Sequence, residues 1–273
     1  MPELPEVESI CRGLKPRLVG RCVKTAVVRC AKLRWPVPSD ISKKISNQEI
    51  LDIKRRGKYL LFIFDSSALM IHLGMSGFLH LVTNGNASTK HDHVDFVLDN
   101  GFLLRFNDPR RFGSVLLTEK DPLQHKLLKD LGPEPLGDDF DGKHLFNSAK
   151  NRSLAIKNFI MDSKVVVGVG NIYASEALFL AKIKPDASVC DINLQQYVLL
   201  ADSIKSVLLR AIDAGGTTFR DFRNHLGEKG GFAESLYVYN RSGLPCRICG
   251  TTIEKITIGQ RSTYFCPNCQ KYG

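Results

Sequence analysis

The first residues of the chain place a reactive amine beside a carboxylate. Pro2 follows the initiator Met1, and Glu3 follows Pro2. Because proline is small and unobstructive at this position, we expect Met1 to be removed, which leaves Pro2 with a free secondary amine of pKa about 7.7–8.0. Such an amine can attack an electrophilic carbon and form an iminium, a permanent positive charge and electron sink. The alternative is that Pro2 and Pro5 only stiffen a leader before the first helix.

Four cysteines near the other end of the chain have the spacing of metal ligands. They form two Cys-x2-Cys knuckles separated by sixteen residues: Cys246, Cys249, Cys266 and Cys269. Four thiolates at this spacing bind Zn²⁺ tetrahedrally and leave no position for water, so we predict one structural zinc ion. The alternatives are a redox dithiol pair, which does not need a second knuckle, or a chance arrangement. The zinc would hold a small hairpin with Arg261 at its tip, where a cation can bind phosphate or only face solvent.

Two further polar residues follow glycines at the start of expected regular elements. Asn171 follows a glycine-rich turn and begins a helix, where backbone N–H groups and the carboxamide form a ready phosphate site. The glycines before Asn171 could instead serve only a tight connection. Lys58 follows Gly57 at the start of a strand.

Apolar side chains also stand at turns beside arginines. Residues 108–113 combine Arg110 with Phe112 in a proline–glycine turn, and Met75 lies at another turn. An exposed Met and Phe beside arginines can wedge into a base stack, but for each residue taken alone ordinary core packing is the favoured interpretation. His91 and His93 open a nearby strand, and no acidic or cysteine partner is placed to complete a metal site with them. We therefore predict no metal at these histidines.

The charge of the chain favours a polyanionic partner. Its 273 residues contain 38 Lys and Arg against 28 Asp and Glu, a formal charge of +10. Nucleic acid is the first candidate and an anionic membrane the second, unless the protein is merely basic. The most apolar window, residues 59–64, is far too short to span a bilayer, and no secretory pattern is present. We therefore expect a cytosolic protein without disulfides, in which Cys11, Cys22, Cys30 and Cys190 serve as small apolar residues.

Hydrophobic periodicity predicts that the first half of the chain is a helix followed by β-structure. Apolar residues at steps of three and four predict an amphipathic helix after Pro5 that ends at Gly20. From there to about residue 118, short strands alternate with turn signals, which is typical of a β-sandwich or barrel. The strands are expected at residues 22–29, 58–65, 68–73, 78–82, 93–98, 102–106 and 113–118.

The second half of the chain has a helical period. Residues 132–139 are rich in Gly, Pro and Asp and predict a linker. Helices are expected at residues 144–149, 153–161, 172–181 and 194–214. The predicted organisation is a first domain of residues 1–131, a linker of 132–142, a helical domain of 143–235 and a zinc hairpin of 236–273.

These motifs together resemble the bacterial formamidopyrimidine-DNA glycosylase (Fpg/MutM) family, which are bifunctional base-excision repair enzymes for oxidised purines. The matching segments follow the family's order from one end of the chain to the other. They are residues 1–8, 56–60, 72–77, 90–95, 108–113, 132–135, 167–176 and the four-cysteine tail. Ser9 is a slight departure, where the family often has threonine. The start Pro-Glu-Leu-Pro-Glu separates the chain from the sister endonuclease VIII group, which resembles Pro-Glu-Gly-Pro-Glu and favours oxidised pyrimidines.

The resemblance implies an α+β multidomain fold. An N-terminal helix and a β-sandwich would face a helical domain that carries a helix–two-turn–helix motif and the four-cysteine zinc finger. Damaged double-stranded DNA would bind in the cleft between them, to a monomer with no membrane attachment. The implied reaction removes 8-oxoguanine opposite cytosine, and formamidopyrimidines, through a Schiff base followed by β,δ-elimination.

The resemblance also implies roles for the reactive residues. The amine of Pro2 would attack C1′ of the damaged nucleotide, and Glu3 would move protons during opening of the sugar ring. Lys58 would contact phosphate and take part in β-elimination. Arg261 would grip the phosphates flanking the lesion and support δ-elimination. The iminium acidifies the C2′ hydrogens, which explains why loss of the base leads on to strand cleavage.

Further DNA contacts are implied by position in the family motifs. Met75, Arg110 and Phe112 would fill the space left by the extruded nucleotide, with Arg110 reading the unpaired cytosine. The remaining implied DNA contacts are His72, His91, Arg152, Asn171 and Tyr239. Glu6 and a glycine-containing loop at residues 217–231 are candidates for contacting the extruded base. The alternatives are a glycosylase for oxidised pyrimidines and a non-catalytic zinc-dependent DNA-binding protein, and the intact Pro2, Glu3 and Lys58 argue against the latter.

Overall fold

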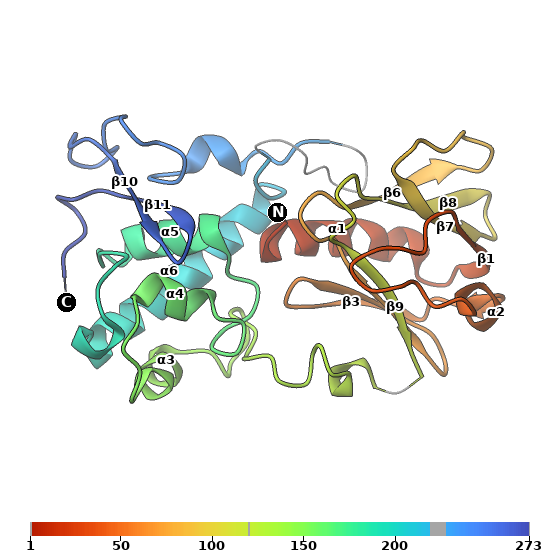
Figure 1. Ribbon diagram of the computed structural model, residues 1–273, viewed down its shortest axis with the longest axis horizontal. Helices are drawn as coiled ribbons and strands as arrows, with labels where there is room; N and C mark the ends of the chain where they lie inside the picture. Colours follow the sequence, from red (N-terminus) through yellow and green to blue (C-terminus); the bar gives the residue numbers. More distant parts are fainter. Residues whose placement is uncertain (1, 120, 219–227, 273) are drawn as a thin grey trace. The chain divides into compact units, whose positions relative to one another are not determined.

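The computed structural model describes residues 2–119, 121–218 and 228–272, which Figure 1 shows in colours that follow the sequence. The chain divides into two compact units. The first unit comprises Met1–Lys129 and Ala214–Gly231, and the second comprises Asp130–Asp213 and Phe232–Gly273. Within the described residues, none of the helices has both the length and the apolar character needed to cross a membrane.

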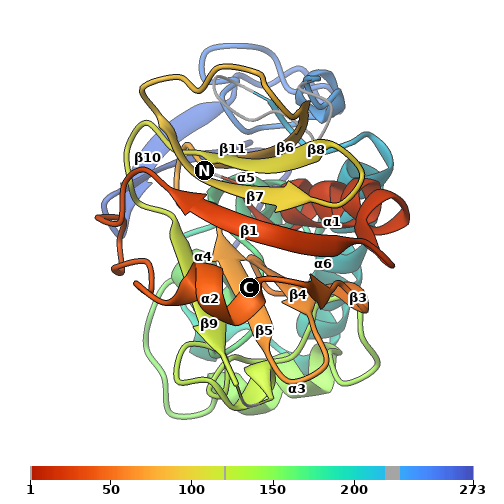
Figure 2. The same cartoon turned by 90° about the vertical axis from the view of Figure 1, so that its right-hand side faces the viewer.

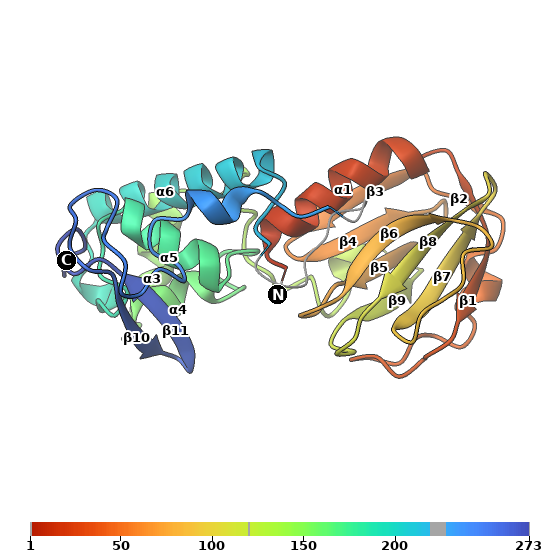
Figure 3. The same cartoon turned by 90° about the horizontal axis from the view of Figure 1, so that it is seen from above.

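The first unit begins with helix α1 (Leu4–Leu18), which carries the predicted reactive residues at its start. Glu3 is the N-cap and Glu6 stands at the third helical position, and the two form a reciprocal capping box. Pro5 is accommodated in the first turn, where its missing N–H needs no helical partner. The apolar face of α1 packs into the core of the first unit, so the start of the helix is fixed by burial as well as by its cap. Figure 3 shows α1 running alongside strands of this unit.

Two antiparallel sheets form the predicted sandwich (Figure 2). One hydrophobic core contains side chains from α1 and from both sheets, such as Leu14, Phe96 and Ile71. The first sheet has the strand order β2 (Gln48–Glu49), β1 (Cys22–Val28), β7 (Asp92–Leu98), β8 (Phe102–Asn107), β6 (Phe78–Thr83). The second sheet has the order β3 (Asp52–Arg56), β4 (Tyr59–Ile63), β5 (Ala68–His72), β9 (Ser114–Thr118). The unit also contains α2 (Ile41–Ile45) and the short helix η1 (Pro122–Gln124).

The sequence prediction missed β2, β3 and α2. In β3, Ile53 is fully buried, whereas its neighbours are charged, so the alternating pattern is hidden. The strand expected at residues 58–65 begins at Tyr59 instead. Gly57 has a φ of +55°, and with Lys58 it forms the two-residue turn between β3 and β4.

The second unit is helical, as predicted. Its helices are α3 (Gly142–Ala149), α4 (Ile156–Met161), α5 (Asn171–Leu180), α6 (Leu194–Asp213), with short helices η2 (Val189–Asp191) and η3 (Phe232–Ser235). α6 packs against both α3 and α5. A Cβ atom on Gly142 would lie 2.4 Å from the backbone of Val198, so the glycine permits close contact between α3 and α6. The helix expected at residues 153–161 starts later, because the Ile156 N–H bonds to the distant carbonyl of Ala187.

The C-terminal hairpin packs onto α5. Strands β10 (Glu254–Ile258) and β11 (Arg261–Phe265) are joined by Gly259 and Gln260, both with positive φ. Arg261 is therefore the first residue of β11, directly after the two-residue tip. A small core joins Phe179 of α5 to Cys246 and Cys266.

Candidate functional site

The buried N-terminus of α1 is connected to the start of the loop at residues 217–231. Pro2 is buried and Glu3 is 2% exposed. One carboxylate oxygen of Glu6 accepts the Glu3 N–H (2.8 Å), and the other accepts the Thr217 N–H (2.7 Å). Thr217 also pairs with Gly231, which closes the base of the loop. Residues 219–227 of this loop, which include Gly227, lie outside the described residues.

Arg55 connects the turn of Lys58 to α1. Its Nε donates to Glu8 (2.7 Å), and its guanidinium also donates to the Gly57 carbonyl (3.1 Å). Burial opposes ionisation of Glu8, but hydrogen bonds from Arg12 and Arg55 outweigh it and lower the pKa of that carboxyl. The two segments that carry Glu3 and Lys58 are thus held by one ion pair, a role for Arg55 that the sequence analysis missed.

His72 lies in a hollow of about 540 Å³ in the first unit. The lining residues are Arg34, His72, Gly74, Met75, Arg111 and Phe112. Burial, followed by the nearby charges of Lys58 and Arg34, lowers the pKa of His72 from 6.5 to about 4. The Nδ1 atom accepts the Gly74 N–H (3.0 Å), so a neutral imidazole carries its proton on Nε2. At neutral pH His72 is therefore an uncharged hydrogen-bond donor. Arg34, which faces the same hollow, was not identified from the sequence.

The predicted wedge residues are exposed rather than packed in the core. Met75 is 38% exposed and Phe112 is 45% exposed. The guanidinium carbon of Arg110 lies 5.0 Å from the centre of the Phe112 ring. The two turns are in direct contact, because a Cβ atom on Gly74 would lie 2.4 Å from the backbone nitrogen of Gly113. The structure thus excludes core packing for both side chains.

His91 lies beside the turn that carries Arg110 and Phe112. Its carbonyl oxygen accepts the Asp108 N–H (3.0 Å), and the His91 ring lies edge-on to the ring of His93 at 6.5 Å. The Nε2 atom of His93 lies 2.8 Å from the carbonyl oxygen of Asp108. His93 therefore has a structural partner in the turn that carries Arg110.

In the second unit, a buried lysine joins Asn171 to the C-terminal hairpin. Lys157 is 0% exposed, and its Nζ donates to the Asn171 carboxamide oxygen (2.6 Å) and to Thr263 Oγ1 (2.7 Å). Asn171 itself donates to the Ser262 carbonyl (3.0 Å), beside the exposed Arg261. Asn171 and the backbone next to Arg261 are thus brought together. Lys157 was missed from the sequence, although a lysine inside the apolar run of α4 was a signal.

Tyr239 is positioned by a buried carboxylate on α5. Glu176 is 1% exposed and accepts the backbone N–H groups of Tyr237, Val238 and Tyr239 at 2.8–2.9 Å. Burial raises the pKa of Glu176, and these three donors oppose that rise. The Tyr239 ring lies 5.1 Å from that of Tyr264 on β11. This fixes the backbone of Tyr239 relative to the hairpin.

Arg152 lies at the surface of the second unit. Its guanidinium carbon is 5.6 Å from the centre of the Phe159 ring, and one of its nitrogens is 3.5 Å from an Asp162 carboxylate oxygen. The side chain of Arg152 is 39% exposed, so its charge is accessible.

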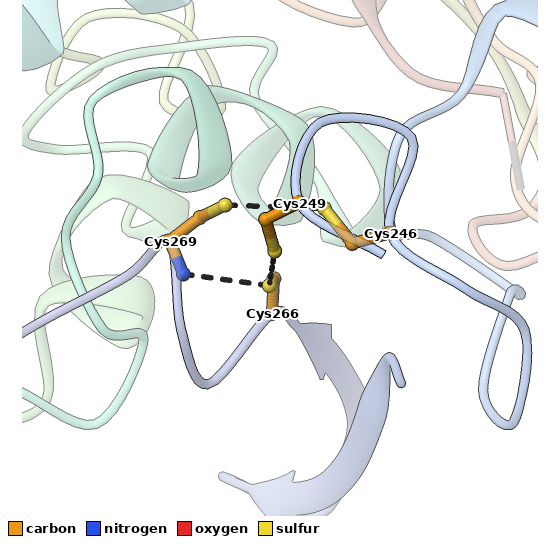
Figure 4. Close-up of side chains that lie close together, drawn as sticks. All are labelled: Cys246, Cys249, Cys266 and Cys269. Atoms are coloured by element: carbon orange, nitrogen blue, oxygen red, sulfur yellow. Dashed lines mark hydrogen bonds between the residues drawn. The ribbon is translucent and has the colours of Figure 1, made fainter. Parts of the chain in front are cut away.

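The four predicted ligand cysteines form one cluster (Figure 4). All four Sγ atoms lie within 4.8 Å of one another, with Cys246 and Cys269 at 3.9 Å and Cys249 and Cys266 at 3.5 Å. A tetrahedron with Zn–S bonds of about 2.3 Å has S–S edges of roughly 3.8 Å, so the cluster fits one zinc ion. Without metal, hydrogen bonds from Thr251 and Asn268 lower the pKa of Cys249 to about 5, whereas burial raises the pKa of Cys266 and Cys269.

Comparison with known proteins gives one consistent match along the chain. The profile of the formamidopyrimidine-DNA glycosylase N-terminal domain matches residues 1–115. The profile of the formamidopyrimidine-DNA glycosylase H2TH domain matches residues 131–223, and a zinc finger found in FPG and IleRS matches residues 243–271.

Curated relatives share about half of their residues with the chain. Formamidopyrimidine-DNA glycosylase of Nitrosococcus oceani is 53% identical over 270 residues, which are 99% of this chain and 100% of the relative. The protein of the same name from Pseudomonas putida (strain W619) is 52% identical over 271 residues, again 99% of this chain and 100% of the relative.

Solved structures match the fold over nearly the full length. A Lactococcus lactis FPG mutant in complex with a Fapy-dG containing DNA has a TM-score of 0.92 and 35% identity, covering 99% of this chain and 100% of that one. Lactococcus lactis Fpg with an abasic site containing DNA has a TM-score of 0.91 and 35% identity, covering 98% and 99% of the chains. MutM (FPG) of Thermus thermophilus has a TM-score of 0.88 and 35% identity, covering both chains completely.

Proposed function

The chain belongs to the formamidopyrimidine-DNA glycosylase family, and from that premise we propose that it removes 8-oxoguanine opposite cytosine, and formamidopyrimidines, from duplex DNA. It is a DNA glycosylase and abasic-site lyase of base-excision repair. The observation that carries this function is the match of three family profiles, in order, along a chain that starts with Pro2 and Glu3. Solved relatives hold a Fapy-dG containing DNA and an abasic site containing DNA, which supports the same substrate class here.

The reaction begins at the amine of Pro2 once Met1 is removed. The nitrogen attacks C1′, and the bond to the damaged base breaks with its electron pair leaving on the base, which takes up a proton. Glu3 then gives a proton to O4′ as the sugar ring opens, and C1′ becomes an iminium. The buried, capped first turn supports this role, because it fixes the carboxyl of the residue that directly follows Pro2.

Strand cleavage follows from the iminium. It acidifies the C2′ hydrogens, and loss of one of them expels the 3′ phosphate, with Lys58 assisting the proton transfer. A second elimination expels the 5′ phosphate with help from Arg261, and leaves a gap of one nucleoside. The ion pair of Arg55 with Glu8 supports this assignment, because it connects the Lys58 turn to the helix that carries Glu3.

Access to C1′ requires the nucleotide to leave the base stack. Met75, Arg110 and Phe112 fill the vacated space, and Arg110 reads the unpaired cytosine. Their exposure, and the stacking of Arg110 on Phe112, support this role. Glu6 is also a candidate for contact with the extruded base. It accepts a hydrogen bond from Thr217, where the loop proposed for the same contact begins.

Phosphate contacts come from both units. His72 donates from Nε2 as a neutral imidazole, and His91 lies near the wedge turns. In the second unit, Asn171, Tyr239 and Arg152 bind phosphate or other DNA groups. The finger, formed by the four cysteines, holds one structural zinc ion, which keeps the β10–β11 hairpin folded beside α5.

We further propose that the protein acts as a cytoplasmic monomer. By the domain limits predicted from the sequence, residues 1–131 then carry Pro2, Glu3, Lys58 and the wedge residues. A linker at 132–142 joins them to the DNA-binding residues 143–235 and to the zinc hairpin 236–273, which carries Arg261. Gel filtration with light scattering, with and without lesion DNA, tests the monomer, and a dimer on one lesion would contradict it.

Borohydride trapping tests the enzyme claim. Protein with verified loss of Met1 should form a covalent complex with DNA carrying 8-oxoguanine opposite cytosine, and Pro2→Gly or Glu3→Gln should impair turnover. Protein that binds this DNA but neither traps nor cuts it would sink the claim and leave a zinc-dependent binding protein. A panel of oxidised purine and pyrimidine lesions at equal concentrations decides between the purine and the pyrimidine assignments.

A further inference from the structure

Asp108 is a fully buried carboxylate to which the roles above assign no function. It precedes the Arg110 turn and is 0% exposed. Its Oδ1 accepts the hydroxyl of Ser76 (2.8 Å) and the backbone N–H of Arg110 (3.3 Å), and its Oδ2 accepts the N–H of Gly113 (2.8 Å). A charge this deep in the protein is tolerated only when hydrogen bonds replace its hydration, as they do here.

The partners of Asp108 come from three separate turns. Ser76 follows Met75, and Arg110 and Gly113 flank Phe112. The backbone of Asp108 adds the third turn, because its N–H donates to the His91 carbonyl and its own carbonyl lies 2.8 Å from His93 Nε2. Both turns that carry predicted wedge residues are therefore hydrogen-bonded to Asp108.

The geometry of the wedge turn shows how closely this arrangement is packed. Arg111 has a φ of +56°, in the left-handed region that a non-glycine residue seldom adopts. A Cβ atom on Gly113 would lie 2.7 Å from the His72 carbonyl oxygen and 3.1 Å from Asp108 Oδ2. The backbone around Phe112 is held in an uncommon conformation by these contacts, so the turn depends on its partners for its shape.

We propose that Asp108 is a positioning residue for nucleotide extrusion. Its carboxylate locks the turns of Met75, Arg110 and Phe112 into one preformed wedge that enters the base stack as a unit. The proposal rests on the function proposed above. A wedge that is already ordered does not have to be ordered during extrusion, so the effect of Asp108 falls on the step that removes the base from the stack.

The consequence is a separation of the two activities. Excision of 8-oxoguanine from a paired duplex requires a stacked and paired base to be extruded. Cleavage at a preformed abasic site does not, because no base is left to unstack. Loss of the Asp108 carboxylate therefore slows the first reaction much more than the second, while the chemistry at Pro2 stays intact.

The test compares Asp108→Asn with a matched change elsewhere in the same unit. Asp95→Asn is the control, because Asp95 is 1% exposed and bonds to Arg105 and Arg29 rather than to the wedge turns. Single-turnover rates are measured on 8-oxoguanine opposite cytosine, on the same duplex with a preformed abasic site, and on 8-oxoguanine opposite an abasic analogue. In the third substrate 8-oxoguanine has no base to pair with, so it leaves the stack more easily. The excision rate of Asp108→Asn on this substrate should therefore return toward that of wild type.

We expect Asp108→Asn to lower excision from the paired duplex about 10- to 100-fold. Cleavage of the duplex with a preformed abasic site, and borohydride trapping on that same duplex, should stay within about threefold of wild type. Asp95→Asn should leave the ratio of the two rates unchanged, even where it lowers the melting temperature more. Equal losses of both activities in Asp108→Asn would overturn the proposal.

Two further outcomes keep the result decisive. Should Asp108→Asn not fold, Ser76→Ala removes a single donor to the same carboxylate, and an unchanged rate ratio in that variant also overturns the proposal. Wild-type protein that cuts neither substrate contradicts the proposed function instead. The positioning role is therefore tested separately from the enzyme claim.

Discussion

The two units position their predicted DNA contacts around buried groups of opposite charge. In the first unit the carboxylate of Asp108 accepts hydrogen bonds from Ser76, Arg110 and Gly113. In the second unit the ammonium of Lys157 donates to the side chains of Asn171 and Thr263. Both groups are 0% exposed, so both depend on these hydrogen bonds to offset desolvation.

The sign of the buried charge decides what each group can hold. A carboxylate accepts backbone N–H groups, which turns leave unpaired, so Asp108 fixes the shape of loops beneath an apolar wedge. An ammonium binds carbonyl oxygens, and its charge also adds positive potential beside the surface that carries Arg261 and Asn171. We therefore expect changes in the first unit to act on nucleotide extrusion and changes in the second to act on DNA affinity.

Removal of zinc should give the largest effect and should be confined to the second unit. Chelation, or Cys249→Ala, removes the metal that holds the hairpin, and with it the Ser262 and Thr263 partners of Lys157. DNA affinity should fall by at least about 100-fold, because the hairpin is too small to fold without metal. Full affinity in the metal-free protein would contradict the structural role of zinc.

The single tryptophan of the chain gives the control for this experiment. Trp35 lies in the first unit. Its emission and its thermal transition should be unchanged after chelation, since the sandwich has its own core. A loss of the Trp35 transition together with DNA binding would mean that the units do not respond separately.

Replacement of Lys157 should weaken binding without slowing chemistry. In Lys157→Met the buried acceptors on Asn171 and Thr263 lose their donor, which costs about 1–3 kcal/mol, or roughly 5- to 150-fold in affinity if the loss falls on the bound state. The excision rate at saturating protein should stay near that of wild type. Lys157→Gln, which keeps donors on a shorter side chain, should recover part of the affinity. A slower excision rate at saturating protein, with unchanged DNA affinity, would contradict this prediction. Lys157 would then act on the reaction rather than on binding.

The smallest predicted effect concerns His72 and pH. The pKa of His72 is about 4 in the folded protein against about 6.5 when unfolded. The unfolded state therefore binds more protons between pH 4 and 6.5, so this group lowers folding stability as the pH falls through that window and has little effect above it. The full pKa difference corresponds to about 3 kcal/mol in the free energy of unfolding. Because solvent reaches the partly exposed ring, we expect a loss of only about 1–2 kcal/mol.

The change that isolates this effect is His72→Gln, which keeps a donor and an acceptor but does not titrate. Unfolding of the first unit, followed by Trp35 fluorescence, should depend less on pH between 4 and 6.5 in the variant. A ring titration of His72 by NMR gives the pKa directly. A titration midpoint near pH 6.5 would contradict the assignment of His72 as a neutral hydrogen-bond donor whose pKa is lowered by burial.

Local spacing was sufficient to predict part of this structure. The four cysteines lie close in sequence, and their spacing predicted a cluster that the structure confirms. The local sequence around Met75 and Phe112 was less informative, because core packing was the favoured interpretation of each residue taken alone, and the structure shows both side chains exposed. The four cysteines, in contrast, lie within one short segment of the chain.

The residues that the sequence did not reveal act through distant partners. Lys157 bonds to residues about one hundred positions away, and Asp108 joins turns that contain Ser76 and His91. Helix α4 was predicted too long for a similar reason. The residues just before Ile156 are extended, because this part of the chain hydrogen-bonds to the distant segment that contains Ala187. A charged residue in an apolar run shows that a partner must exist, but only the fold shows which one.

Peptide mapping of the borohydride-trapped complex tests the central claim most directly. After digestion of both protein and DNA, the residual sugar should be found on the N-terminal peptide that begins with Pro2, attached to its backbone nitrogen. A retained Met1 or an N-terminal tag should abolish trapping, and removal of the tag should restore it. A sugar attached to Lys58 or another lysine, with the amine of Pro2 unmodified, would contradict the account.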